Sequence, residues 1–246
     1  MTADPAAPTD AAPTDVLTHP MAVAYRATRA RITELTTGLD DASADSIVPA
    51  CPDWTVRQLC SHLAGVCADL VAGNRPTGDV QAWVDAQVEA RDDRSVAELL
   101  AEWNAAGPAF EQLVVDRPKG YAGLLYDIVA HEHDLRAVLG RPGARDSDGV
   151  RLSLDIVMAT LARDLLASEL PAVRVISDDG EWRAGDGEPA LTLDLTGQAD
   201  GTWQLLRALG SRRSAAQLRA LPWVGDLDRH LPALAHQPLP VTDLVE

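Results

Sequence analysis

The chain has 246 residues, of which 46% are hydrophobic, a composition that fits a folded protein and excludes wholesale disorder. Its formal net charge of −16 argues against binding nucleic acid or an anionic membrane through bulk electrostatics. No apolar run reaches the roughly 18 residues that span a bilayer, and residues 1–15 have the composition of a disordered tail. We therefore expect a cytoplasmic protein whose partners are neither nucleic acids nor membranes.

The first helix is expected over residues 16–37, with Asp15 as its N-cap, and a long connection follows it. The second helix begins with a capping box from Thr55 to Gln58, in which each end can satisfy a free backbone N–H of the other. It continues to about residue 73, and a short helix is expected over residues 79–91. For the connection between the first two helices, the sequence predicts only an ordered turn at its end.

A third long helix begins with a second capping box, from Ser95 to Glu98. It is expected to break at Pro118 to Gly120, and a fourth helix follows that includes residues 126–140. Residues 16–145 therefore predict a four-helix bundle, a fold that builds metal sites from side chains on facing helices.

The pattern changes after the fourth helix, and residues 146–246 predict a small α+β domain. One amphipathic helix is expected first, then alternating apolar residues that indicate strands around a turn, then two short helices. The ranges are 149–169 for the helix, 173–176 and 191–195 for the strands, and 199–209 and 213–221 for the last helices. The expected fold class is α+β overall.

The most informative stretch runs from Tyr126 to Gly140, where three ionisable side chains recur at helical spacing: Asp127, His131 and Asp134. At about 100° per residue, steps of four and seven residues place them on one strip of the helix, beside a strip of apolar residues. A carboxylate and an imidazole four residues apart can bind one metal ion. His133 points to nearly the opposite side.

His62, at the edge of the apolar stripe of the second helix, supplies a third candidate ligand. Two histidines and one carboxylate leave open coordination positions, as in catalytic zinc and facial-triad iron sites. The alternative is that His62 is a core-edge histidine bonded to a backbone carbonyl. Asp134 could hold the imidazole of a metal ligand, or it could pair with an arginine.

Two blocks of this sequence resemble the mycothiol-dependent maleylpyruvate isomerase family, whose members are DinB-like metal-binding bundles with a C-terminal extension. The blocks are VPACPDWTVRQLCSHLAGV and DIVAHEHDLRAVLGRP, and the later segment LRALGSRRSAAQLRALPWVGD is similar to the family's C-terminal segment. The resemblance covers residues 20 to 235, approximately. It implies a DinB-like bundle followed by a small α+β domain.

The resemblance also implies site residues. Family members bind a divalent metal, usually taken as zinc, through a histidine on the second helix and a carboxylate–histidine pair on the fourth, which match His62, Asp127 and His131. The characterised isomerase has glutamate where this chain has Asp127. The family's C-terminal arginine, which contacts the carboxylates of the substrate, best matches Arg212, although serine precedes it where glycine is usual. Arg212 and Asp134 are the candidate catalytic residues.

The function implied by the resemblance is a metal-dependent enzyme that uses mycothiol, a low-molecular-weight thiol, as cosubstrate with a small electrophilic substrate. The thiolate could add reversibly to an activated double bond and so permit isomerisation, or it could stay attached, as in an S-transferase. Two other functions remain open. One is a metal hydrolase that uses metal-bound water, with Asp134 or Glu132 as general base. The other is a non-catalytic binding or regulatory bundle.

Overall fold

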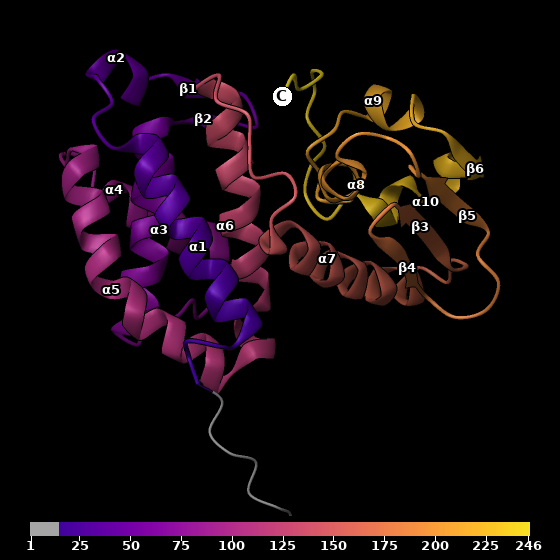
Figure 1. Cartoon of the computed structure of the whole chain (residues 1–246), viewed down its shortest axis with the longest axis horizontal. Helices are drawn as coiled ribbons and strands as arrows, with labels where there is room; N and C mark the ends of the chain where they lie inside the picture. Colours follow the sequence, from indigo (N-terminus) through magenta and orange to yellow (C-terminus); the bar gives the residue numbers. More distant parts are fainter. Residues whose placement is uncertain (1–14) are drawn as a thin grey trace, which may run out of the picture.

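The structure is a computed structural model that describes residues 15–246. Apart from Asp15, the predicted disordered tail of residues 1–15 lies outside that range. Figure 1 shows a helical bundle followed by a smaller part with helices and a sheet, so the predicted α+β fold class is confirmed. We retain 16–145 and 146–246 as the proposed domains. None of the helices within the described range is long and apolar enough to cross a membrane.

Four long helices form the bundle, and a short helix packs against the second of them. The long helices are α1 (Pro20–Thr36), α3 (Val56–Val71), α5 (Val96–Asp116) and α6 (Pro118–Val138), and the short one is α4 (Val80–Glu89). Both predicted capping boxes form, at the starts of α3 and α5. The bundle core is built from large apolar side chains that are fully buried, among them Ile32, Leu59, Leu99, Trp103 and Leu125.

Two helix starts differ from the prediction, and proline explains both. Asp15 does not cap α1: its carboxylate accepts the N–H of Leu17 in a turn, and α1 begins at Pro20. The predicted break between the third and fourth helices is present, but it lies at Arg117 and not at Pro118 to Gly120, because α6 begins at Pro118. Proline suits the first helical position because its φ is already helical and the missing N–H would have no partner there.

The connection between α1 and α3 contains structure that the sequence pattern did not indicate. A single turn of helix, α2 (Asp41–Ala44), precedes a small antiparallel hairpin of β1 (Ile47–Val48) and β2 (Cys51–Thr55). The hairpin matters because β2 leads directly into α3 and carries Cys51 and Trp54 to the side of α6.

The second part of the chain is a four-stranded sheet with helices packed against it. In the strand order β4-β3-β5-β6, the central pair β3–β5 is parallel and the outer pairs are antiparallel. Helix α7 packs against both α6 and α8, so it joins the sheet to the bundle (Figure 1). The last strand and the last helix were not predicted. The elements are α7 (Asp148–Ala167), β3 (Val173–Ser177), β4 (Gly180–Ala184), β5 (Leu191–Asp194), α8 (Gly201–Leu209), α9 (Ala215–Arg219), β6 (Trp223–Gly225) and α10 (Leu227–Leu234).

Candidate metal centre

The three predicted metal ligands meet between α3 and α6. His62 lies on α3, and Asp127 and His131 lie one turn apart on α6. The carboxylate of Asp127 stands between the two imidazoles: its Oδ2 is 3.2 Å from Nε2 of His62, and its Oδ1 is 3.3 Å from Nε2 of His131. The three side chains therefore bring two imidazole nitrogens and one carboxylate together.

This arrangement fits a metal ion. Zinc bonds to imidazole nitrogen and carboxylate oxygen at about 2.0–2.2 Å, so in tetrahedral geometry its donor atoms lie about 3.4 Å apart. The distances of 3.2 and 3.3 Å between the carboxylate oxygens and the histidine nitrogens are close to that value. The ligand atoms of His62, Asp127 and His131 all lie within 4.8 Å of one another. The donor atoms are therefore close enough together to be candidate ligands of one divalent cation.

The site opens to solvent on the side of Asp127. The side chain of Asp127 is 30% exposed, whereas those of His62 and His131 are 6% exposed. The indole of Trp54 covers the histidines, with its ring centre 5.0 Å from that of His62 and 6.3 Å from that of His131. A ligand can therefore approach from the carboxylate side, while the hairpin shields the imidazoles from water.

The charges of the three side chains stabilise one another. Burial favours the neutral form of Asp127, but the neighbouring His131 and His62 outweigh it and hold the pKa of the carboxyl well below its usual range. Burial also lowers the pKa of His131, but the charge of Asp127 and hydrogen bonds to Asp127, Asp134 and Cys51 raise it well above its usual value. A metal ion would take the place of the proton that this ion pair shares.

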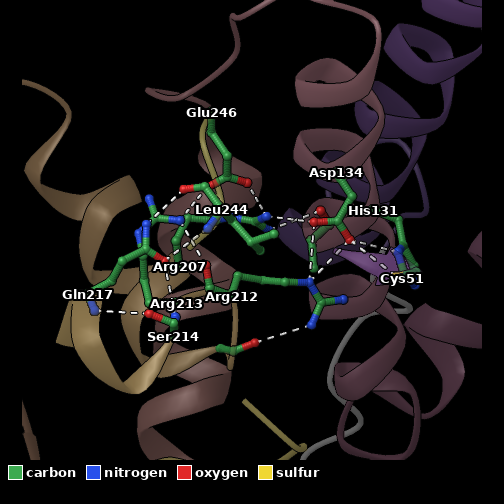
Figure 2. Close-up of polar contacts among 12 residues, drawn as sticks. Cys51, His131, Asp134, Arg207, Arg212, Arg213, Ser214, Gln217, Leu244 and Glu246 are labelled. Atoms are coloured by element: carbon green, nitrogen blue, oxygen red, sulfur yellow. Dashed lines mark hydrogen bonds and ion pairs between the residues drawn. The ribbon is translucent and has the colours of Figure 1, made fainter. Parts of the chain in front are cut away.

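Asp134 holds His131 from behind. Its Oδ2 lies 3.0 Å from Nδ1 of His131, the nitrogen that faces away from the triad. Asp134 also accepts a hydrogen bond from Nη2 of Arg207 at 2.6 Å and one from Nε of Arg212 at 3.2 Å (Figure 2). Burial raises the pKa of Asp134, but the two guanidinium charges outweigh this and keep the pKa well below its usual range. An ionised acceptor on Nδ1 orients the imidazole with Nε2 toward a metal.

Arg207 also belongs to a further set of ion pairs. The carboxylate of Glu246 contacts both Arg207 and Arg213 (Figure 2). The segment before Glu246 is tied down by Gln217, which donates to the carbonyl of Leu244 at 2.8 Å and accepts its N–H at 3.2 Å. Asp134 on the bundle is thus connected through Arg207 to the last residue of the chain.

Most of the predicted site residues come together, and both suggested partners of Asp134 are present, a histidine and an arginine. Within residues 15–246, neither ring nitrogen of His62 bonds a backbone carbonyl, which disfavours the alternative role for this residue. Arg212 lies on Asp134 and not on the triad itself. Glu132 is fully buried against Arg31 and Arg136, so it faces away from the site that a hydrolase would need. His133 lies on the opposite side of α6, as predicted, against Trp203.

Sequence reasoning missed Cys51, Trp54, Arg207 and Glu246. The sulfur of Cys51 lies 3.9 Å from Oδ2 of Asp134, and with His131 the three form a second cluster of possible ligands. Asp134 is already neutralised by two arginines, so this second cluster offers a cation less than the triad does. One signal was available for Arg207: it is an arginine inside an apolar helical run, which requires a buried anion as partner.

Two comparisons with known proteins found a match. Residues 25–136 match the family model of the mycothiol maleylpyruvate isomerase N-terminal domain. The fold is similar to a crystal structure of a histidine-to-alanine mutant of the mycothiol-dependent maleylpyruvate isomerase, with a TM-score of 0.53 and 10% sequence identity. That likeness covers 79% of this chain and 90% of the other. At this identity it shows the fold alone. No curated protein matches the chain.

Proposed function

We propose, on the premise that the chain belongs to the mycothiol maleylpyruvate isomerase family, that it is a metal-dependent enzyme with mycothiol as cosubstrate and a small electrophile as substrate. The observation that carries the proposal is the triad of His62, Asp127 and His131, with its donor atoms spaced for one divalent cation. The family match over residues 25–136, which contain all three side chains, supports the choice of thiol.

A divalent metal, with zinc as the first choice, would supply a Lewis acid that keeps a thiol deprotonated near neutral pH. His62, Asp127 and His131 would hold it and leave at least one position open, the pattern of catalytic sites with three protein ligands. Asp134 orients the imidazole of His131, and Trp54 excludes water from the buried side.

The chemistry that we propose is addition of the thiolate sulfur to an activated double bond. A carbon–sulfur bond forms as the electrons of the double bond move onto the conjugated carbonyl. Rotation and expulsion of the thiolate would complete an isomerisation, whereas retention of the bond and uptake of a proton would complete an S-transfer. Arg212 keeps its charge beside Asp134, and its side chain is 13% exposed. It is the residue that we propose to face the carboxylate or developing oxyanion of the substrate.

The test is metal content followed by thiol-dependent turnover. We expect about one divalent ion per chain and consumption of maleylpyruvate or a model electrophile only when mycothiol is present. His62→Ala should remove both, whereas His236→Ala is the matched control because His236 pairs with Asp164 away from the triad. Metal binding without thiol-dependent turnover would reject the mycothiol reaction. Ester or amide turnover without thiol would favour the hydrolase, and absence of metal uptake would favour a non-catalytic bundle.

A further inference from the structure

One contact between the bundle and the second part of the chain involves Tyr126, the residue directly before the metal ligand Asp127 on α6. The hydroxyl of Tyr126 donates a hydrogen bond to the carbonyl of Gly210, just after α8, at 2.6 Å. The two residues are 84 positions apart in the chain. This bond is separate from the ion pair of Asp134 with Arg212, so it ties the same turn of chain to α6 at another point.

The phenol approaches the backbone at Gly210 so closely that only glycine fits there. A Cβ built at position 210 would lie 2.7 Å from the hydroxyl oxygen of Tyr126 and 3.0 Å from Cε2 of its ring. Real Cβ atoms essentially never come within 3.0 Å of another heavy atom, so a side chain at this position would displace the phenol. The hydrogen bond of Tyr126 therefore depends on the glycine.

The carbonyl that accepts a hydrogen bond from Tyr126 also accepts one from Arg212. Nη1 of Arg212 lies 3.5 Å from the oxygen of Gly210, and Nε of Arg212 lies 3.2 Å from each carboxylate oxygen of Asp134. The guanidinium is therefore held at two points, by the carboxylate directly and by the phenol through the carbonyl. Among residues 15–246, Nη2 of Arg212 has no hydrogen-bond partner, so it is the group left to meet a ligand.

The two metal ligands of α6 lie between the two residues that hold Arg212. Tyr126 and Asp134 are eight residues apart, and Asp127 and His131 come between them. Because a helix rises about 1.5 Å per residue, one segment roughly 12 Å long carries both ligands and both contacts. The place of the guanidinium relative to the metal centre therefore depends on this segment of α6.

We propose that Tyr126 is a positioning residue, which holds Arg212 beside the metal centre so that Nη2 meets a carboxylate of the electrophilic substrate. The contact with substrate rests on the proposed function, whereas the positioning of the guanidinium does not. A guanidinium that bonds only to Asp134 can turn about that contact. A second bond, to a carbonyl that the phenol keeps in place, sets the direction of Nη2.

The first test compares a charged and an uncharged electrophile in Tyr126→Phe, with mycothiol as cosubstrate. KM for maleylpyruvate should rise several-fold, roughly the effect of one hydrogen bond, whereas KM for dimethyl maleate, which has no carboxylate, should not change. Tyr121→Phe is the matched control, because Tyr121 lies on the same helix and its hydroxyl accepts a hydrogen bond from Arg75. An equal rise in KM for both electrophiles, or loss of metal in Tyr126→Phe, would overturn the proposal.

A double-mutant cycle tests whether Tyr126 acts through Arg212. Arg212→Gln alone should raise KM for maleylpyruvate more than Tyr126→Phe does. Addition of Tyr126→Phe to Arg212→Gln should then have no further effect, because the group that the phenol positions is already gone. Independent, additive effects of the two substitutions on KM would contradict the proposal.

An NMR experiment tests the positioning without any turnover. In the ¹⁵N-labelled full chain, Arg212→Gln identifies the Nε–H signal of Arg212 by its loss. Tyr126→Phe keeps the ring and removes only the hydroxyl, so it should shift this signal, whereas Tyr121→Phe should not. An unchanged signal in Tyr126→Phe would overturn the proposal. If the wild-type chain binds metal but converts neither electrophile, the proposed function fails, and the NMR result alone decides whether Tyr126 holds Arg212.

Discussion

Glu111 and Asp127 are two carboxylates of the bundle that each lie between two basic side chains, and they differ in what those basic groups can do. The carboxylate of Glu111 on α5 accepts a hydrogen bond from Nε of Arg26 at 2.7 Å and one from Nη2 of Arg29 at 2.8 Å. Asp127 on α6 has histidines as its partners. A guanidinium has no lone pair and does not lose its proton in proteins, whereas an imidazole can lose its proton and bind a metal. The same pattern of charge is therefore a clamp between α1 and α5 in one place and a candidate metal centre in the other.

Distance and exposure agree with this distinction. The nitrogen–oxygen distances in the ion pairs of Glu111 are those of ordinary hydrogen bonds, and its side chain is only 4% exposed. The nitrogen–oxygen distances at Asp127 are 3.2 and 3.3 Å, and its side chain is 30% exposed. A buried cluster with short hydrogen bonds holds two helices together, whereas a cluster with wider spacing and access to solvent can take a ligand.

Removal of one imidazole should have the largest effect. In His131→Ala, metal content should fall from about one equivalent to near zero, because two remaining protein ligands do not form a stable zinc site. Metal analysis after dialysis measures this, and circular dichroism reports whether the bundle stays folded. Retention of full metal content by folded His131→Ala would remove this residue from the site.

Loss of the clamp should affect stability and spare the metal. Glu111→Ala leaves the buried guanidinium of Arg29 and the half-exposed one of Arg26 without their anion, so the free energy of unfolding should fall by about 3 kcal/mol. Urea denaturation measures the loss. Metal affinity of the folded fraction should not change, and a parallel loss of metal would show that the two carboxylates do not have separate roles.

Asp134→Asn should weaken metal binding without abolishing it. The amide keeps the shape of the side chain but loses the charge that orients His131. Loss of such a partner of a metal ligand typically lowers metal affinity by roughly 10–100-fold. Competition with a metal-sensitive dye gives the dissociation constant. Asp134→Ala should cost more, because it also leaves Arg207 and Arg212 without their shared anion. An unchanged affinity in Asp134→Asn would argue that the contact with His131 has no effect on the metal.

Acidification should weaken metal binding gradually. In the metal-free protein the pKa of His131 is raised by Asp127, so the imidazole is protonated near neutral pH and must release a proton to bind metal. Because the metal requires the neutral form, affinity should increase with pH by about tenfold per pH unit below that pKa. Calorimetry in buffers of different ionisation enthalpy counts the released proton. Glu111→Gln should leave this slope unchanged, since Glu111 contacts none of the candidate metal ligands.

Local signals in the sequence indicated most of the helices and the candidate ligands, and the family resemblance favoured those ligands over the alternative for His62. Asp127 and His131 are one helical turn apart, the capping box at Thr55 marks the start of α3, and His62 follows at the edge of that helix's apolar stripe. Such relations depend on neighbours in the chain, which a sequence displays directly.

Ion pairs between residues far apart in the chain could not be predicted from the sequence in the same way. Glu246 reaches Arg207 from 39 residues away and Arg207 reaches Asp134 from 73 residues away, and each is an ordinary charged residue in its own segment. The hairpin that brings Trp54 to the histidines contains a two-residue strand and a proline, too little pattern to indicate β structure. Pro118 was taken as part of a break and Pro20 was placed inside the first helix, although each is the first residue of its helix.

The burial of Asp134 has a consequence for the order of events during synthesis. The ribosome delivers His62, Asp127, His131 and Asp134 well before it delivers the arginines on which Asp134 depends. Until those arginines arrive, the nascent bundle must keep this carboxylate hydrated or protonated, because burying it alone would be costly. The face of α6 that carries Asp134 should therefore close last. Pulse proteolysis of stalled chains should find α6 protected only after the segment through Arg212 has emerged.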